Sequence, residues 1–157
     1  MADKACHVVG STTQVGLTQA LGLTGESVVA EDFDVEQFVY IKIPDAIQPL
    51  DRGAIFEDPI DAALRPGELG HVSGGGSLLG DTRPDGSRPI EFCGIDVDTT
   101  NRDAVLEILR KLLPDLGIPQ ATELHYTAGG AKLQDRFLGA DWAVAEPRDF
   151  LHPGFDI

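Results

Sequence analysis

The sequence predicts a single α+β domain of 157 residues, on three observations. Residues 38–43 alternate apolar and polar side chains with the period of a half-buried strand. Residues 100–113 carry an apolar stripe at helical spacing. Between the extended segments 69–79 and 90–98, the turn Pro84-Asp85-Gly86 predicts that these segments pair as antiparallel neighbours. Hydrophobic residues make up 42% of the chain, so we expect it to fold around a core despite its acidity.

The first 37 residues are predicted to be an N-terminal extension. The capping-box pattern of residues 11–14 predicts a helix that ends near Gly22. The strand at 38–43 then places Val39, Ile41 and Ile43 on one face, and Pro44 ends it because proline lacks a donor for the strand ladder.

A short helix is predicted over 59–65. Asp58 is its expected N-cap, and Pro59 suits the first helical position, whereas residues 49–53 are interpreted as a turn. Pro66 and Gly67 stop this helix. The extended segment 69–79 follows, and its three successive glycines, Gly74, Gly75 and Gly76, are expected to break it.

The second arm of the hairpin, residues 90–98, allows two interpretations. A regular pleat puts Cys93, Ile95 and Val97 on one face and Ile90 and Phe92 on the other, so both faces are partly covered. Alternatively, Cys93-Gly94 forms a bulge that shifts the phase, and we favour this bulge because glycine suits it.

A second helix is predicted from Thr100, its expected cap, with Asp103 at the reciprocal position. Its regular part should end by Leu113, before Pro114. A strand follows at 122–127. Residues 128–157 are predicted to be a docking tail, because large apolar groups are scattered through them at Trp142, Val144, Phe150, Leu151 and Phe155.

The order between residues 38 and 127 is strand, helix, strand, strand, helix, strand. This order resembles the ferredoxin-like plait, or split βαβ fold. The resemblance implies that strands 38–43 and 90–98 are central and that 69–79 and 122–127 are edges. It carries no function, because this fold hosts enzymes, metal carriers, RNA binders and protein modules alike.

The acidic stretch from Glu26 to Asp61 is the strongest indication of a partner. It holds ten acidic and two basic residues, which is −8 of the formal charge of −14. Such a surface attracts basic proteins and steers their approach, although acidity also serves solubility alone. We therefore expect a non-enzymatic protein that binds a basic protein partner, with an immunity-type or antitoxin-type inhibitor as one form. The expected binding residues are Glu31, Asp32, Asp34, Glu36, Asp51, Glu57 and Asp58.

Composition argues against other partners. Twelve basic residues against twenty-six acidic ones oppose nucleic acid, even if Tyr40, Lys42 and Phe92 shared an open sheet face. No segment approaches the ~20 apolar residues of a membrane helix. Cys6 and Cys93 form no CxxC motif, so we expect a soluble cytoplasmic protein without a cofactor.

Two further function classes remain open. A metal-dependent or small-molecule enzyme would use Asp96, Asp98 and His71 near the glycines 74–76, with Asp103 as a third carboxylate. Solvated and capping roles are the favoured interpretation of these acids. The histidines and cysteines lack the paired spacing of zinc sites. The triple glycine suits an anion cradle less well than an exposed edge open to a partner's strand. Edge strands also favour a homodimer.

Overall fold

The computed structural model describes residues 33–149. The strands are β1 (Phe38–Ile43), β2 (Gly70–Leu79), β3 (Ile90–Thr99), β4 (Glu123–Ala128), β5 (Ala131–Phe137) and β6 (Trp142–Pro147). They form one antiparallel sheet in the order β2-β3-β1-β4-β5-β6. The helical elements are η1 (Val35–Gln37), α2 (Pro49–Arg52), the π-helical turn η2 (Gly53–Glu57), α3 (Asp58–Leu64), η3 (Arg65–Gly67) and α4 (Arg102–Asp115).

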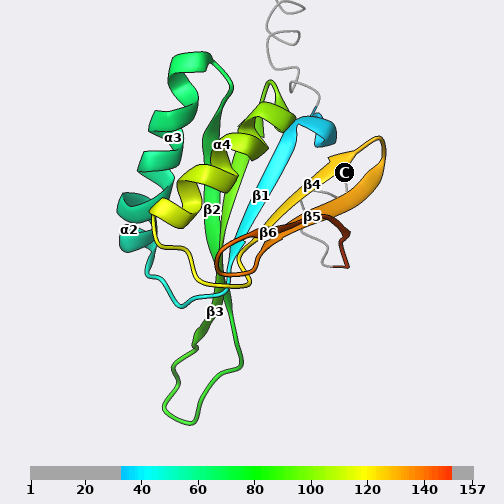
Figure 1. Ribbon diagram of the computed structural model, residues 1–157. Coiled ribbons are helices and arrows are strands. Elements are labelled where there is room, and N and C mark those ends of the chain that lie inside the picture. Colours follow the sequence, from blue (N-terminus) through cyan, green and yellow to red (C-terminus); the bar gives the residue numbers. More distant parts are fainter. Residues whose placement is uncertain (1–32, 150–157) are drawn as a thin grey trace, which may run out of the picture. The chain divides into compact units, whose positions relative to one another are not determined.

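The fold is α+β, as predicted, with α2, α3 and α4 on one face of the sheet (Figure 1). The predicted strands are all present, and β2 is an edge strand as expected. The sheet has two strands more than the predicted four. The hairpin loop between β2 and β3 projects beyond the rest of the sheet (Figure 1).

The strand β4 is not an edge, contrary to prediction. Gly129 and Gly130, with φ of 58° and 78°, form a two-residue turn after which β5 pairs along the whole of β4. A tight hairpin turn of this type needs positive φ at both central residues, which glycine adopts without strain. Much of the predicted docking tail therefore belongs to the sheet as β5 and β6.

The bulge predicted at Cys93-Gly94 was wrong. The pairing of β1 with β3 is regular through both residues, and the irregularity in β3 lies at Glu91 instead. Both faces of the sheet are covered here: Cys93 belongs to the main core, whereas Phe92 packs on the opposite face. Gly94 is needed because the Tyr40 ring lies against it, and a β-carbon there would overlap the Tyr40 hydroxyl.

The first helix is longer than predicted, and the segment interpreted as a turn is its beginning. Pro49 occupies the first helical position, and Gly53 adopts ordinary helical geometry. The buried residues Arg52, Phe56, Ile60 and Leu64 recur every four positions. Four residues exceed one α-helical turn, so the wider π-helical turn η2 keeps them on one side.

The second helix α4 begins one residue later than predicted. Asn101, not Thr100, is its N-cap, since the Asn101 side chain accepts a bond from the Ala104 amide. The Thr100 hydroxyl instead donates to the Glu68 carbonyl. The helix continues through Pro114 to Asp115, although Leu113 was its expected end.

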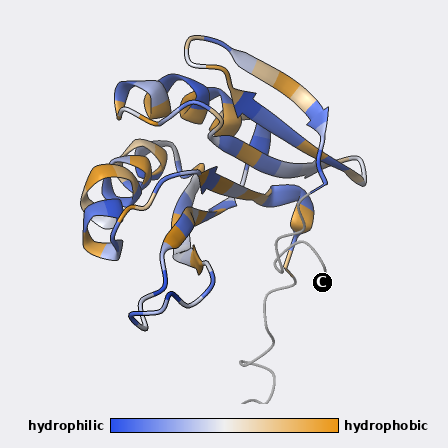
Figure 2. Ribbon diagram, turned by 90° about the horizontal axis from the view of Figure 1, so that it is seen from below, coloured by the Kyte–Doolittle hydropathy of each residue, from blue (hydrophilic) through white to orange (hydrophobic). Residues whose placement is uncertain are grey.

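Apolar side chains form two clusters on opposite faces of the sheet. The main core lies between the sheet and the helices, and it includes Ile41, Ile95, Ile60 and Leu109. A smaller cluster of Phe38 and Tyr40, with Val35 and Phe92 against it, lies on the other face. Figure 2 shows hydrophobic and hydrophilic residues alternating along the strands.

Among residues 33–149, no helix is both long enough and apolar enough to cross a membrane. The predicted helix at 11–22 lies outside the described residues, as do the apolar residues Phe150, Leu151 and Phe155 of the expected tail.

Candidate functional site

Two acids of the predicted binding stretch, Asp34 and Glu36, make contacts within the protein. Glu31 and Asp32 lie outside the described residues. Asp34 caps η1 by accepting from the Glu36 amide at 3.0 Å. Glu36 accepts from Arg102 at 3.0 Å and from the amides of the β4–β5 turn, Gly129 and Gly130. The bond from the Gly130 amide is the main cause that lowers the pKa of Glu36.

Glu57 is also engaged within the protein. It accepts from Arg52 Nε at 2.5 Å, and this ion pair lies over the triple glycine of β2. A β-carbon at Gly75 would stand 2.6 Å from Glu57 Oε1, so glycine lets the helical segment approach the strand. The space over Gly75 is thus occupied by the side chains of this ion pair and is not an open cradle for an anion.

The outer edge of β2 is partly occupied as well. The Val72 amide donates to Asp61 Oδ1 at 3.1 Å, and Arg52 Nη1 donates to the Gly76 carbonyl at 3.0 Å. Asp61 also pairs with Arg65. A partner strand added to this edge would have to displace these contacts.

Asp51 and Asp58 are the two predicted binding residues that stay exposed and whose side chains, within residues 33–149, form no hydrogen bond or ion pair. They lie on the outer side of α2, η2 and α3, next to Leu50, which is 88% exposed, and Ile55, which is 45% exposed. We call this set the acidic helical surface: Leu50, Asp51, Ala54, Ile55, Asp58 and Ala62.

The residues proposed for metal binding do not converge. His71 Nε2 lies 3.9 Å from Asp98 Oδ2 on the face opposite the helices, and both side chains are exposed. Asp96 lies against Gly74, whereas Asp103 lies on α4 and binds Arg102. Within residues 33–149, no three or more His, Cys, Asp or Glu side chains are grouped so as to hold a metal ion.

Two other predicted candidates are buried. His125 is fully buried, and its Nε2 lies 2.7 Å from Glu123 Oε2. The Cys93 thiol lies in the main core and donates to the carbonyls of Asp45 and Ile47. The predicted core role of Cys93 is confirmed.

The aromatic and basic residues considered for nucleic acid contact one another. Lys42 Nζ lies 4.9 Å from the centre of the Phe92 ring and 3.7 Å from Glu123. Tyr40 is buried, and burial, followed by the charge of Asp96, raises its pKa to about 12. These residues therefore do not form the open, basic sheet face that is typical of an RNA-binding protein.

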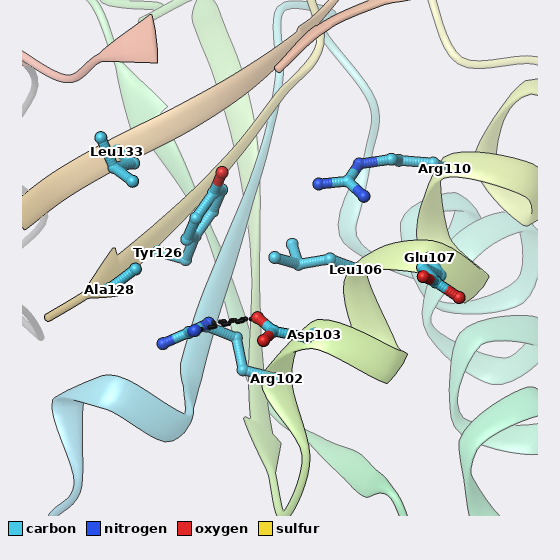
Figure 3. A pocket seen from close by; sticks show the side chains of 8 residues that line it. All are labelled: Arg102, Asp103, Leu106, Glu107, Arg110, Tyr126, Ala128 and Leu133. Atoms are coloured by element: carbon cyan, nitrogen blue, oxygen red, sulfur yellow. Dashed lines mark hydrogen bonds and ion pairs between the residues drawn. The ribbon is translucent and has the colours of Figure 1, made fainter. Parts of the chain in front are cut away.

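A groove lies between α4 and the β4–β5 hairpin (Figure 3). It was not predicted from the sequence. Its volume is about 360 Å³. Leu106 faces Tyr126 across it, with Arg110 and Arg102 at its two ends (Figure 3). Its lining consists of Arg102, Asp103, Leu106, Glu107, Arg110, Tyr126, Ala128 and Leu133.

A fully buried carboxylate, Asp135, organises one end of this groove. Its Oδ2 accepts two bonds from Arg110, at 2.8 and 2.5 Å, and its Oδ1 accepts from the Tyr126 hydroxyl and the Ala145 amide, both at 2.9 Å. These contacts tie α4, β4, β5 and β6 together. Burial, followed by the bond to Asp135, raises the pKa of Tyr126 to about 12, so the phenol stays protonated.

One signal in the sequence points to this carboxylate. Leu133, Asp135 and Phe137 alternate along β5, so Asp135 occupies a position where the strand pattern calls for an apolar residue. A charge at such a position needs a buried partner, which Arg110 supplies from 25 residues earlier in the chain.

Comparisons of the chain with protein-family models, curated proteins and solved structures found no match.

Proposed function

We propose that the protein is a non-enzymatic binding protein that engages a basic protein partner through the acidic helical surface. The observation that carries this proposal is that the exposed acids Asp51 and Asp58 share one helical surface with Leu50, which is 88% exposed. An apolar anchor beside unneutralised charge is the composition of a protein interface, where apolar groups give affinity and charges give rate and specificity.

The neighbouring cations support this assignment. Arg52, the basic residue of α2, is buried and engaged by Glu57, so it does not offset the charge of Asp51 or Asp58. Arg65 is paired with Asp61. With a formal charge of −14 for the whole chain, long-range attraction should speed the approach of a cationic surface.

An inhibitor of a basic enzyme, of the immunity or antitoxin kind, is the concrete form that we propose. Such a protein acts by occupying a cationic surface that otherwise binds an anionic substrate. The charge pattern supports this form, and it requires no catalytic group on this chain.

We also propose that the first four strands and the helices on one face of the sheet make a ferredoxin-like plait, extended by β5 and β6. The order β2-β3-β1-β4, all antiparallel, supports this proposal, as does the placement of α3 and α4 on one face. A homodimer through the sheet edges has less support, since β2 already bonds to Asp61 and Arg52. The mass of the protein in solution tests it.

The proposed function is tested by the salt dependence of association with a cationic probe. The probe is a synthetic amphipathic peptide of leucine and lysine, and its leucine–glutamate counterpart is the negative control. We expect the association rate to fall by about tenfold or more as the ionic strength rises from ~0.05 M to ~0.5 M. Equal rates at both ionic strengths would overturn the proposal.

Matched variants locate the binding surface. Asp51→Asn with Asp58→Asn should weaken binding and flatten its salt dependence. The control, Asp81→Asn with Asp115→Asn, removes the same charge from exposed sites elsewhere and should retain both. An equal loss in the two double variants would mean that net charge alone attracts the probe, and that this surface does not bind it.

A further inference from the structure

We propose that the groove between α4 and the β4–β5 hairpin receives a single lysine or arginine side chain of the partner. This inference rests on the proposed function for the basic nature of the partner. It assigns a subsite on another part of the molecule, away from Asp51 and Asp58.

The walls of the groove suit the aliphatic stem of such a side chain. Leu106 of α4 and Leu133 of β5 face the groove with the Tyr126 ring and Ala128 (Figure 3). Lysine and arginine bury their methylene groups along apolar surface while the charged head stays in water. A volume of about 360 Å³ is at the small end of ligand pockets, which fits one long side chain.

The charges around the groove favour a cation. The two guanidinium groups face four carboxylates: Glu36 and Asp103 bind Arg102, Asp135 binds Arg110, and Glu107 completes the set. The charged residues that line the groove sum to zero, and with Glu36 and Asp135, which bind the two guanidinium groups, the formal charge of the cluster is −2.

Two of these carboxylates lie on the exposed side of one helix. Asp103 and Glu107 are four residues apart on α4, so their carboxylates lie on the same side of the helix, and Asp103 is already paired with Arg102. Glu107 is exposed and, within the described part of the chain, forms no hydrogen bond or ion pair. An ammonium or guanidinium group at the mouth of the groove would give the Glu107 carboxylate a partner.

An anion has poorer prospects in the same groove. Arg102 already donates from Nε, Nη1 and Nη2 to Asp103, Glu36 and the Thr127 carbonyl. Arg110 holds Asp135 with Nε and Nη2. An anionic ligand would have to compete with these carboxylates for all of these donors, and within residues 33–149 only Nη1 of Arg110 remains without a hydrogen bond among them.

The test is an NMR titration of the full ¹⁵N-labelled chain with three small probes. N-acetyl-lysinamide supplies the stem and the charge, N-acetyl-norleucinamide the stem alone, and N-acetyl-glutamate amide an anion. We expect N-acetyl-lysinamide to shift the resonances of Leu106, Ala128 and Leu133 at the lowest concentration. Equal binding of norleucinamide, or preferred binding of the glutamate probe, would overturn the proposal.

Variants of Glu107 and Asp115, which are both exposed, keep the test independent of folding. Glu107→Gln should weaken N-acetyl-lysinamide binding by about two- to fivefold, the usual value of one exposed ion pair. Asp115→Asn, an exposed acid at the end of the same helix, should leave the affinity unchanged. Ala128→Leu should fill the groove and abolish binding. An unchanged affinity in Glu107→Gln would overturn the proposal.

The two proposals can fail separately. If none of the small probes shifts the groove residues, while the leucine–lysine peptide still binds in an Asp51- and Asp58-dependent way, the groove is not a subsite and the proposed function stands. If N-acetyl-lysinamide occupies the groove but the peptide binds without salt dependence, the groove is a subsite for a basic side chain, and the proposed function of the acidic helical surface is wrong.

Discussion

Glycine is needed at position 94 because the side chain of Tyr40 packs directly on the backbone there, and not because the backbone needs a special conformation. The Tyr40 ring of β1 lies against Gly94 of the neighbouring strand β3, where it is almost fully buried. An aromatic ring over a glycine covers backbone that would otherwise be poorly packed in a sheet. This contact belongs to the face opposite the helices, where Phe38 completes the cluster.

Gly94→Ala should therefore destabilise the protein by about 1–3 kcal/mol, because the new methyl group overpacks the site and displaces Tyr40. Gly76 is the matched control: it pairs with Gly94 across the β2–β3 ladder, yet a β-carbon there meets nothing within 4 Å. Gly76→Ala should stay within about 0.5 kcal/mol of the wild type. Urea unfolding of both variants measures the difference, and equal losses would contradict this account of Gly94.

The sequence marked Gly94 as unusual but suggested the wrong reason for it. The alternation along β3 is visible in its own sequence. The need for glycine at position 94 comes from the Tyr40 ring, which lies on another strand 54 positions earlier. The role of Asp135 was not predicted for the same reason, because its partner Arg110 lies on a helix elsewhere in the chain. Local patterns show that a residue is out of place, but only the tertiary neighbour explains why.

At the scale of elements, Trp142 of β6 supplies a hydrogen bond to α4 that Pro114 of the helix cannot make. A proline nitrogen carries no hydrogen, so Pro114 cannot donate to the Arg110 carbonyl four residues earlier in α4. The Trp142 indole N–H of β6 donates to that carbonyl at 3.0 Å. The ring of Trp142 also packs against Phe137, with 5.1 Å between ring centres. The outermost strand is thereby attached to the helix layer.

A double-mutant cycle tests this joint. Trp142→Phe removes the donor and should cost about 1–3 kcal/mol, because the Arg110 carbonyl loses its partner. In a Pro114→Ala background, the new amide at position 114 can donate to that carbonyl, so Trp142→Phe should cost about 1 kcal/mol less. Thermal and urea unfolding of the four proteins give the coupling energy. A coupling energy near zero would show that the indole bond does not compensate for the proline.

Most elements were predictable because their signals are local. The strands 38–43 and 90–98 and the amphipathic helix follow from periodicity and turn residues. The π-helical turn and the strands β5 and β6 escaped prediction, since Pro49 and Gly53 resemble a turn and Asp135 interrupts the apolar face of β5. Of the predicted binding acids, Asp51 and Asp58 have side chains without a partner within residues 33–149, whereas Glu36 and Glu57 form ion pairs that hold the fold together.

For the whole molecule, stability should depend on pH in two steps. Burial lowers the pKa of His125 below 6.5, and its bond to Glu123 opposes this only in part. The unfolded chain therefore binds a proton at a higher pH than the folded chain, and the free energy of unfolding falls as pH decreases below about 6.5. Hydrogen bonds lower the pKa of Glu36, Asp61 and Glu123, so a second fall should follow below pH 4.5.

Urea unfolding between pH 8 and about pH 2 measures both steps. His125→Gln should remove the first step and leave the second, because glutamine cannot take a proton while it can still hydrogen-bond to Glu123. If the variant loses as much stability between pH 7 and pH 5 as the wild type does, His125 is not the group responsible.

An open antiparallel sheet invites fibril growth, because each outer strand offers backbone groups to a further chain. In this protein both margins discourage it. The carboxylate of Asp61 and the guanidinium of Arg52 already saturate the amide of Val72 and the carbonyl of Gly76 on one margin. On the other, Ala145 takes a left-handed conformation and Pro147 has no amide hydrogen. An incoming strand therefore meets an interrupted template on either side, which protects the folded protein from ordered aggregation.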